Sequence, residues 1–138
     1  MYAIRGMLAL LGRVLIVAIF LLSAADDIRR FDDTVTLMKL HKVPFAEWLL
    51  PGAIGFLIVG GISVLVGFKA RFGAFLLLVF LGLATYFFHN FWDLTGEQQT
   101  MQMIQFLKNS SMAGTMVFII AVGAGPCSFV AHSTDTTG

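Results

Sequence analysis

The sequence predicts an all-α integral membrane protein, built as a bundle of four transmembrane helices. Of its 138 residues, 58% are hydrophobic and only 12% are charged, and the mean hydropathy is +0.88. Soluble domains carry about a quarter charged residues, so a soluble globular domain is excluded. The apolar residues also fall in long, almost uninterrupted runs along the chain, which is typical of membrane-spanning helices.

Four of these runs are long enough to cross a bilayer. They cover about residues 6–25, 48–67, 72–91 and 103–123, and about 20 helical residues span the hydrocarbon core. The end of the first run also resembles the cleavage site of a signal peptide, but we expect this run to be retained as a span. The chain is therefore expected to form a single membrane domain over residues 1–138, with a polar tail at 125–138.

The first two spans are joined by a longer link that carries a helical pattern. Ile28, Phe31, Val35 and Met38 recur at helical spacing, while charged residues occupy most of the positions between them. We therefore expect a short amphipathic interfacial helix at about residues 28–42 that lies on the membrane surface. The alternative is an ordinary loop helix that packs on the bundle.

The second and third spans are joined by a tight turn, GFKARFG, at residues 67–73. Its first glycine, Gly67, is expected to end one helix, and Lys69 and Arg71 mark the membrane interface. An even number of spans places both termini on the side of this purely basic turn. Because basic residues in short loops favour the cytoplasmic side, we expect both termini in the cytoplasm (N-in, C-in).

Polar side chains gather at the end of the bundle opposite to that turn. If consecutive helices pack antiparallel, these side chains converge in one polar pocket near the outer leaflet. Ionisable residues in membrane spans are functional candidates by default. The candidate ligand-binding residues are Asp26, Asp27, His89, Asn90, Trp92, Gln105, Lys108 and Asn109. The structural alternative is that Lys108 reaches the interface with its long side chain and that His89 is an ordinary interfacial residue.

Arg13 is a charged residue inside the first span, about two turns or roughly 10 Å from its start. Its side chain is long enough to reach the interface. The same position also allows pairing with an acid or binding of an anionic head group. We assign Arg13 and Arg71 structural, interfacial roles.

The remaining composition argues against several kinds of centre. The single cysteine, Cys127, forms no intrachain disulfide and no Fe–S cluster. A transmembrane b-type haem requires two facing histidines at similar depth, and no histidine pair occurs within a span, so we expect no intrinsic haem. The spacing of His41, His89 and the nearby acids supports no metal site. A net charge of +1 gives no indication of nucleic-acid binding.

Seven short motifs follow one another along the chain. They are GRVLIVAIFLLSA (12–24), HKVP (41–44), Gly-Gly (60–61), GFKARFGA (67–74), FHNFW (88–92), QFLKN (105–109) and GPCSF (125–129). In this order and spacing they resemble the DoxX family, over about residues 10–130. The resemblance implies a four-helix membrane bundle whose recurrent polar positions are Arg13, Arg71, His89, Lys108 and Asn109. The sequence departs from the family pattern at Asp27, where many members carry a lysine, and at Leu57, where many carry a glutamate.

The resemblance also implies a membrane subunit that accompanies a redox enzyme, because the family name comes from a quinol oxidase and thiosulfate–quinone oxidoreductase context. We therefore expect a quinone-linked accessory subunit of a bacterial inner (cytoplasmic) membrane that is not catalytic on its own. Quinone is the expected cofactor, and His89 the group that exchanges a proton with it. The expected partners are the lipid bilayer and other protein subunits or further copies of the chain. The alternative is a non-enzymatic subunit that assembles, escorts or stabilises another membrane protein.

Overall fold

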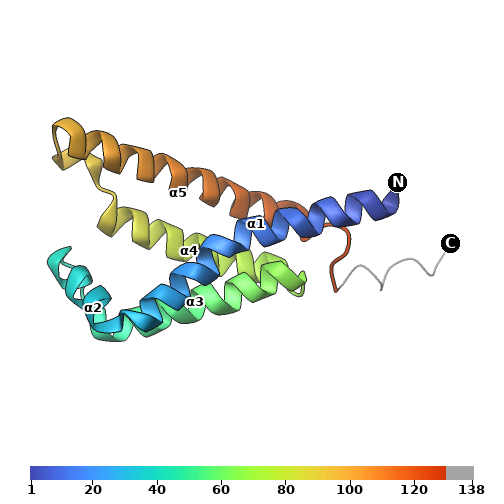
Figure 1. The fold of residues 1–138 in the computed structure, drawn as a ribbon, viewed down its shortest axis with the longest axis horizontal. Coiled ribbons are helices and arrows are strands. Elements are labelled where there is room, and N and C mark those ends of the chain that lie inside the picture. The colour runs from blue at the N-terminus through green and yellow to red at the C-terminus, as the bar shows by residue number, and fades with distance from the viewer. Residues whose placement is uncertain (130–138) are drawn as a thin grey trace.

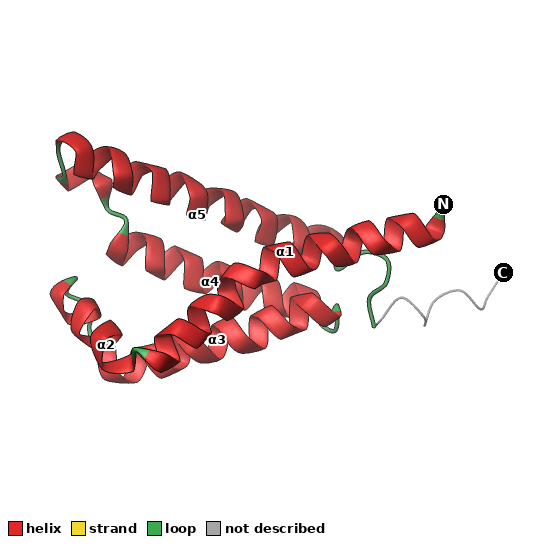
Figure 2. Ribbon diagram, viewed as in Figure 1, coloured by secondary structure: helices red, strands yellow, loops and turns green. Residues whose placement is uncertain are grey.

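The computed structural model describes residues 1–129, and every regular element in that part of the chain is a helix (Figure 1, Figure 2). The elements are α1 (Tyr2–Arg29), α2 (Phe31–Leu40), α3 (Ala46–Val66), α4 (Ala70–Phe88), the 3-10 helix η1 (Phe91–Asp93) and α5 (Gly96–Val122). The predicted all-α class is confirmed. Most of the predicted polar tail, residues 130–138, lies outside the described residues.

The bundle is built around α3, which packs against both α1 and α4, while α4 also packs against α5. Figure 1 shows α5 running beside α4, and α1 crossing in front of α3. Two hydrogen bonds tie the end of α5 to the turn between α3 and α4 and to α1. Arg71 Nη2 donates to the carbonyl oxygen of Ala121 at 3.4 Å, and Arg13 Nη2 donates to that of Cys127 at 2.7 Å. α5 therefore runs back along α4 to the end of the bundle where α1 begins.

The core is an apolar seam where the four long helices meet. It contains Val17 and Phe20 of α1, Leu57 of α3, Leu77 of α4 and Met116 of α5, each at most 2% exposed. The outward faces are apolar as well, with exposed leucine, isoleucine, valine and phenylalanine side chains on all four helices. Soluble monomers rarely expose such large apolar patches, so these faces suit the hydrocarbon of a bilayer.

Three helical segments within residues 1–129 are long and apolar enough to cross a membrane. They are Tyr2–Arg29, Ala46–Val66 and Ala70–Asp93, which correspond to the first three predicted spans. The predicted fourth span, 103–123, lies in α5, which is not among them. α5 begins earlier, at Gly96, and its first half carries glutamines, Lys108 and Asn109. By length and composition, three spans are supported, and α5 is a long helix of mixed polarity packed on one of them.

The Gly-Gly pair of α3 allows close approach of both neighbouring helices. A Cβ atom on Gly60 would lie 2.9 Å from the carbonyl oxygen of Gly73 in α4, and one on Gly61 would lie 2.9 Å from Leu21 Cδ2 in α1. Both distances are shorter than van der Waals contact. A side chain at position 60 would push α3 and α4 apart, because the close atom belongs to the backbone, whereas one at position 61 would displace the Leu21 side chain. Small residues at helix crossings serve this purpose in membrane proteins.

The turn between α3 and α4 is held by Gly67 and Ser63. Gly67 ends α3 with a φ of +78°, a left-handed conformation that glycine adopts without steric cost. The hydroxyl oxygen of Ser63 lies 2.6 Å from the carbonyl oxygen of Phe68 and 3.1 Å from that of Lys69. The predicted helix end at Gly67 is confirmed.

The link between α1 and α3 differs from the helix predicted at 28–42. α1 continues to Arg29 and α2 begins at Phe31, so the apolar pattern is divided between two helices. α2 packs on the start of α3 through a second small core. This core consists of Val35, Met38, Val43, Ala46 and Leu50. Ile28, the first residue of the predicted stripe, is 55% exposed because it belongs to α1 and lies outside this core.

Candidate functional site

A large pocket lies where the end of α1, α2, the start of α3 and the end of α4 meet. Its volume is about 480 Å³, within the range of about 300–1,000 Å³ that is typical of sites for small organic ligands. We call it the large pocket. Its polar side chains are Ser23, Asp27, Thr34 and His89.

Asp27 is positioned by the bend between α1 and α2. The bend brings Thr34 of α2 next to Asp27 of α1, and the threonine hydroxyl donates to Asp27 Oδ1 at 3.5 Å. A carboxylate offers about four acceptor sites, so this one long hydrogen bond leaves Asp27 with acceptor capacity for a ligand. The side chain is half-buried at the pocket wall.

His89 follows the last residue of α4 and is oriented by α5. Its Nδ1 lies 2.8 Å from Oε1 of Gln102. An amide oxygen only accepts hydrogen bonds, so in this arrangement Nδ1 carries the hydrogen and Nε2 of the neutral ring is an acceptor. Sequence reasoning missed Gln102, because the last span was expected to begin at 103. The available signal was its spacing from Gln105, which places both glutamines on one face of a helix.

The rest of the large pocket is apolar and rich in aromatic rings. Its aromatic side chains are Trp48, Phe56, Phe80, Phe87 and Phe88. Trp48 is 82% exposed at the start of α3, where an amphipathic ring suits the membrane interface. The arrangement is suited to a flat, mainly apolar molecule that carries one or two polar atoms at its edge.

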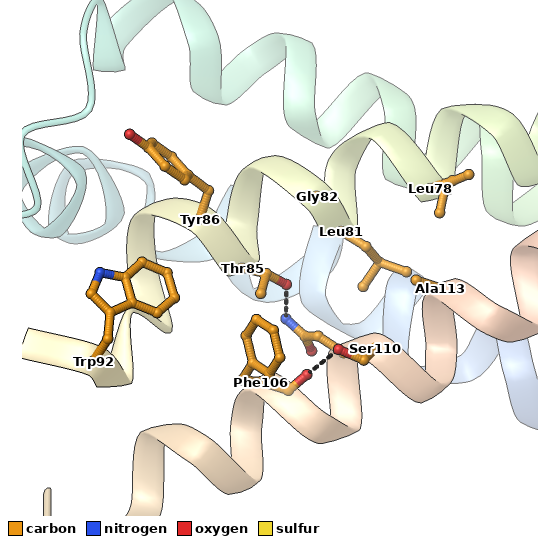
Figure 3. A pocket seen from close by; sticks show the side chains of 10 residues that line it. Leu78, Leu81, Gly82, Thr85, Tyr86, Trp92, Phe106, Ser110 and Ala113 are labelled. Atoms are coloured by element: carbon orange, nitrogen blue, oxygen red, sulfur yellow. Dashed lines mark hydrogen bonds between the residues drawn. The ribbon is translucent and has the colours of Figure 1, made fainter. Parts of the chain in front are cut away.

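A second, smaller pocket of about 290 Å³ lies between α4 and α5. Figure 3 shows Thr85 of α4 near its centre, with Trp92 and Tyr86 toward one end. Asn109 Nδ2 donates to Thr85 Oγ1 at 3.0 Å. The Ser110 hydroxyl is used within α5, where it donates to the carbonyl oxygen of Phe106 at 2.9 Å. The polar groups of the small pocket therefore serve mainly to join the two helices.

The residues predicted to form one pocket are divided by the structure. Asp27 and His89 line the large pocket, and Trp92 and Asn109 line the small pocket. Four others line neither pocket: Asp26 and Lys108, which are exposed, and Asn90 and Gln105, which are half-buried. Lys108 and Asn109 separate because consecutive residues of a helix point about 100° apart. With Asn109 turned toward α4, Lys108 faces outward.

Arg13 and Arg71 lie at the opposite end of the bundle. Arg13 is only 4% exposed, whereas Arg71 is exposed and reaches the end of α5. The sequence allowed Arg13 to pair with an acid, but within residues 1–129 its hydrogen-bond partner is the backbone carbonyl of Cys127. Among the same residues, no group of three or more histidine, cysteine, aspartate or glutamate side chains is placed to hold a metal ion.

The long apolar helices, their apolar outer faces and the pocket at one end of the bundle define the class: a helical integral membrane protein. The family model of DoxX matches residues 8–90, from α1 to the end of α4, and the chain belongs to this family. It is similar to the inner membrane protein YphA of Escherichia coli (strain K12), with 32% identity over 127 residues, or 91% of this chain and 90% of that relative. No solved structure matches the chain at a significant level.

The two departures from the family pattern fall in different parts of the structure. Asp27 lines the large pocket. Leu57 is completely buried in the apolar core and is not part of either pocket. Of these two positions, only Asp27 lies in the large pocket, where it supplies a carboxylate.

Proposed function

We propose that this DoxX-family protein is a quinone-linked accessory subunit of a redox enzyme in the cytoplasmic membrane, and that its large pocket binds the quinone head group. The observation that carries the proposal is the composition of this pocket. Aromatic and aliphatic side chains form its walls, and Asp27 and His89 are its titratable groups. A quinone ring is flat and apolar, and its two oxygens require hydrogen-bonding partners at the edge of the ring.

The proposed chemistry assigns separate roles to the two polar side chains. Oxidation of a quinol releases two protons and two electrons. Nε2 of His89 and the Asp27 carboxylate would accept hydrogen bonds from a bound quinol and would take up these two protons, while the two electrons would pass to the partner redox enzyme. Phe56, Phe80 and Phe87 would pack against the ring, as aromatic pairs favour offset or edge contacts.

We further propose that α5 is a fourth span, so that both termini lie in the cytoplasm and the large pocket faces the outer leaflet. Three properties of α5 support this: its 27 residues are enough to cross a bilayer, it runs back along α4, and Asn109 is bonded to Thr85. A polar side chain within a membrane is tolerated when a neighbouring helix supplies its partner. α2 would then lie at the outer interface, beside the exposed rings of Phe45 and Trp48.

The tryptophans provide a direct test of quinone binding, because each lines a different pocket. Trp48 lines the large pocket and Trp92 the small pocket, and the chain has no other tryptophan. A short-chain ubiquinone analogue, which quenches nearby indole fluorescence, is titrated into purified Trp92→Phe and Trp48→Phe proteins. We expect saturable quenching when only Trp48 is present. Saturable quenching of Trp92 alone would contradict the assignment.

Substitutions in the large pocket test its polar groups. His89→Phe retains an aromatic ring but removes the hydrogen bond, so the affinity for the quinone analogue should fall about fivefold, since such bonds contribute about 0.5–1.5 kcal/mol. Asp27→Asn should have a similar effect, because the amide is a weaker acceptor. Unchanged affinity in both variants would overturn the pocket assignment.

Purification from the native membrane in a mild detergent tests the accessory role. A stoichiometric quinone together with a redox enzyme as the dominant partner is the expected result. A dominant partner without redox cofactors, recovered without quinone, would favour the assembly or escort role instead. Reporter fusions at both termini test the orientation, and activity of a periplasmic reporter at either terminus would contradict it.

A further inference from the structure

Arg13 is a buried charge with incomplete hydrogen bonding. Its side chain is 4% exposed, and Nη2 donates to the carbonyl oxygen of Cys127 at 2.7 Å. Nε and Nη1 are both buried and have no hydrogen-bond partner within residues 1–129. A guanidinium group cannot relieve this by losing its proton, because arginine stays charged in proteins. A buried charge without a partner is strongly unfavourable, so the position calls for an acceptor that the described residues do not supply.

The guanidinium of Arg13 lies at the level of a helix end rather than in the middle of the bundle. A Cβ atom on Gly67 would lie 2.5 Å from Arg13 Nη1 and would also overlap Ser128. The charged group is thus enclosed between the α3–α4 turn and the segment 123–129 that follows α5. The first turns of α1 extend beyond this turn (Figure 1). Arg13 therefore lies well inside α1 and yet at the level of the α3–α4 turn.

Among residues 1–129, the charged side chains near this site are basic. Lys69 and Arg71 begin α4 directly after the Gly67 turn. The carboxylates of residues 1–129 belong to the opposite end of the bundle: Asp26, Asp27, Asp32, Asp33, Glu47, Asp93 and Glu97. Both ion pairs found within this part of the chain are at that opposite end too. Within residues 1–129 no carboxylate pairs with Arg13, so an acceptor for Nε and Nη1 has to come from outside the described residues.

We propose that Arg13 binds a phosphate group at this end of the bundle, supplied by the head group of an anionic phospholipid or by free phosphate. Arginine is well suited to phosphate oxygens because its planar group carries several N–H donors in a fixed arrangement. A basic turn at a helix end also lies where membrane phosphates are expected, and such clusters attract anionic lipids. This site is independent of the large pocket, which lies at the other end of α3 and α4.

Binding requires the segment 123–129 to move away from Arg13, because Nε and Nη1 have no accessible surface. Contacts with α1, the α3–α4 turn and the core hold this segment. They include the Arg13–Cys127 hydrogen bond and a bond from the Phe129 amide to the carbonyl oxygen of Val66, at 3.3 Å. A bound phosphate would replace the Cys127 carbonyl as an acceptor for Arg13.

The wild-type protein provides the first test. Detergent-purified protein is mixed with equal amounts of phosphatidylglycerol and phosphatidylcholine, and bound lipids are counted by native mass spectrometry. We expect a one-to-one phosphatidylglycerol adduct in about tenfold excess over phosphatidylcholine, a ratio that corresponds to about 1.4 kcal/mol. Competition by inorganic phosphate at constant ionic strength would identify a site open to the free anion. Lack of competition would restrict it to lipid head groups. Equal binding of both lipids, with no effect of phosphate, would overturn the proposal.

Variants of Arg13 provide the second test. Arg13→Gln should abolish the preference for phosphatidylglycerol. Arg13→Lys keeps the charge and should weaken the preference, and it serves as the test variant if Arg13→Gln does not fold. Arg5→Gln is the matched control, an exposed arginine on the same helix near the same end, and should retain the preference. Asp135 lies outside the described residues. The variant Asp135→Asn tests whether this carboxylate, instead of a bound anion, is the counter-charge of Arg13. If Asp135→Asn lowers thermal stability as much as Arg13→Gln, and phosphate has no effect on the wild type, the anion site is wrong.

Discussion

The two ends of the bundle differ in how their polar side chains are hydrogen-bonded. At the end that holds the large pocket, polar groups are joined in pairs across different elements. These pairs are Asp27–Thr34, His89–Gln102 and Asn109–Thr85. At the other end, Arg13 has a single backbone acceptor and two nitrogens without one among residues 1–129. One end is therefore built around an apolar cavity whose polar side chains are hydrogen-bonded in pairs, and the other around a buried guanidinium with two nitrogens that lack partners among residues 1–129.

The difference follows from the distribution of charge along the chain. The acidic residues of the described part belong to the connections at the pocket end, whereas the turn at the other end carries only Lys69 and Arg71. At the pocket end the hydrogen-bonded pairs are completed inside the protein, since each side chain finds a partner on another element. The buried guanidinium of Arg13, among basic neighbours, finds no such partners for Nε and Nη1 within residues 1–129. The pocket end thus suits a neutral ligand, and the Arg13 end an anionic one.

The largest effect is expected in the core that separates the two ends. Leu57→Ala should lower the free energy of unfolding by about 2–5 kcal/mol, because a fully buried leucine leaves a cavity. Unfolding of the purified protein by sodium dodecyl sulfate in mixed micelles measures this. The folded fraction should still bind both the quinone analogue and phosphatidylglycerol. A loss of either ligand alone would mean that Leu57 supports one end specifically.

The next largest effect should distinguish the ends from one another. Gly67→Ala places a methyl group against Arg13 Nη1 at a φ of +78°. We expect a loss of about 2–5 kcal/mol, from about 1–2 kcal/mol of left-handed strain and about 1–3 kcal/mol of overpacking. Phosphatidylglycerol binding should be lost, while quenching of Trp48 by the quinone analogue persists.

The matched control is Gly55→Ala. A Cβ atom at this position meets no other atom within 4 Å, and alanine is favoured over glycine in a helix by about 0.5–1 kcal/mol. The variant should therefore be slightly more stable, with both binding activities unchanged. Equal destabilisation by the two glycine substitutions would remove the evidence for a tight contact at Arg13.

A smaller effect is expected for the hydrogen bond that joins α4 and α5. Asn109→Ala should cost about 0.6 kcal/mol and at most about 1.7 kcal/mol, the range measured for hydrogen bonds between membrane helices. Thr85→Ala should cost about the same, and the double variant little more than either single variant, since both remove one bond. Additive losses in this double-mutant cycle would show that the two side chains act independently.

The smallest effect is expected for Lys108→Met. The side chain is exposed and lines neither pocket, so the free energy of unfolding should change by less than about 0.5 kcal/mol. The affinity for the quinone analogue should not change. A tenfold loss of affinity for the quinone analogue would show that Lys108 contributes to the large pocket. It would contradict the division of the polar residues into two groups.

Much of the candidate site was predictable, but its division into two pockets was not. Residue types and their order placed Asp27, His89 and Asn109 at the same end of the bundle. The sequence could not reveal which face of α5 meets α4, so Lys108 and Asn109 were grouped although they point in different directions. The spacing of Gln102 and Gln105 placed both on one face of a helix, but the sequence could not pair Gln102 with His89, because that contact depends on the relative stagger of α4 and α5.

The sequence by itself determined the all-helical membrane class, the positions of three spans, the helix end at Gly67 and the family. These properties are local, since hydropathy, helix length and the left-handed conformation of glycine depend on a few neighbouring residues. Only the tertiary structure decided that α5 turns Asn109 inward and that Arg13 is buried at the level of the α3–α4 turn. Such features depend on the rotation and stagger of packed helices, where a shift of one turn moves a side chain by about 5.4 Å.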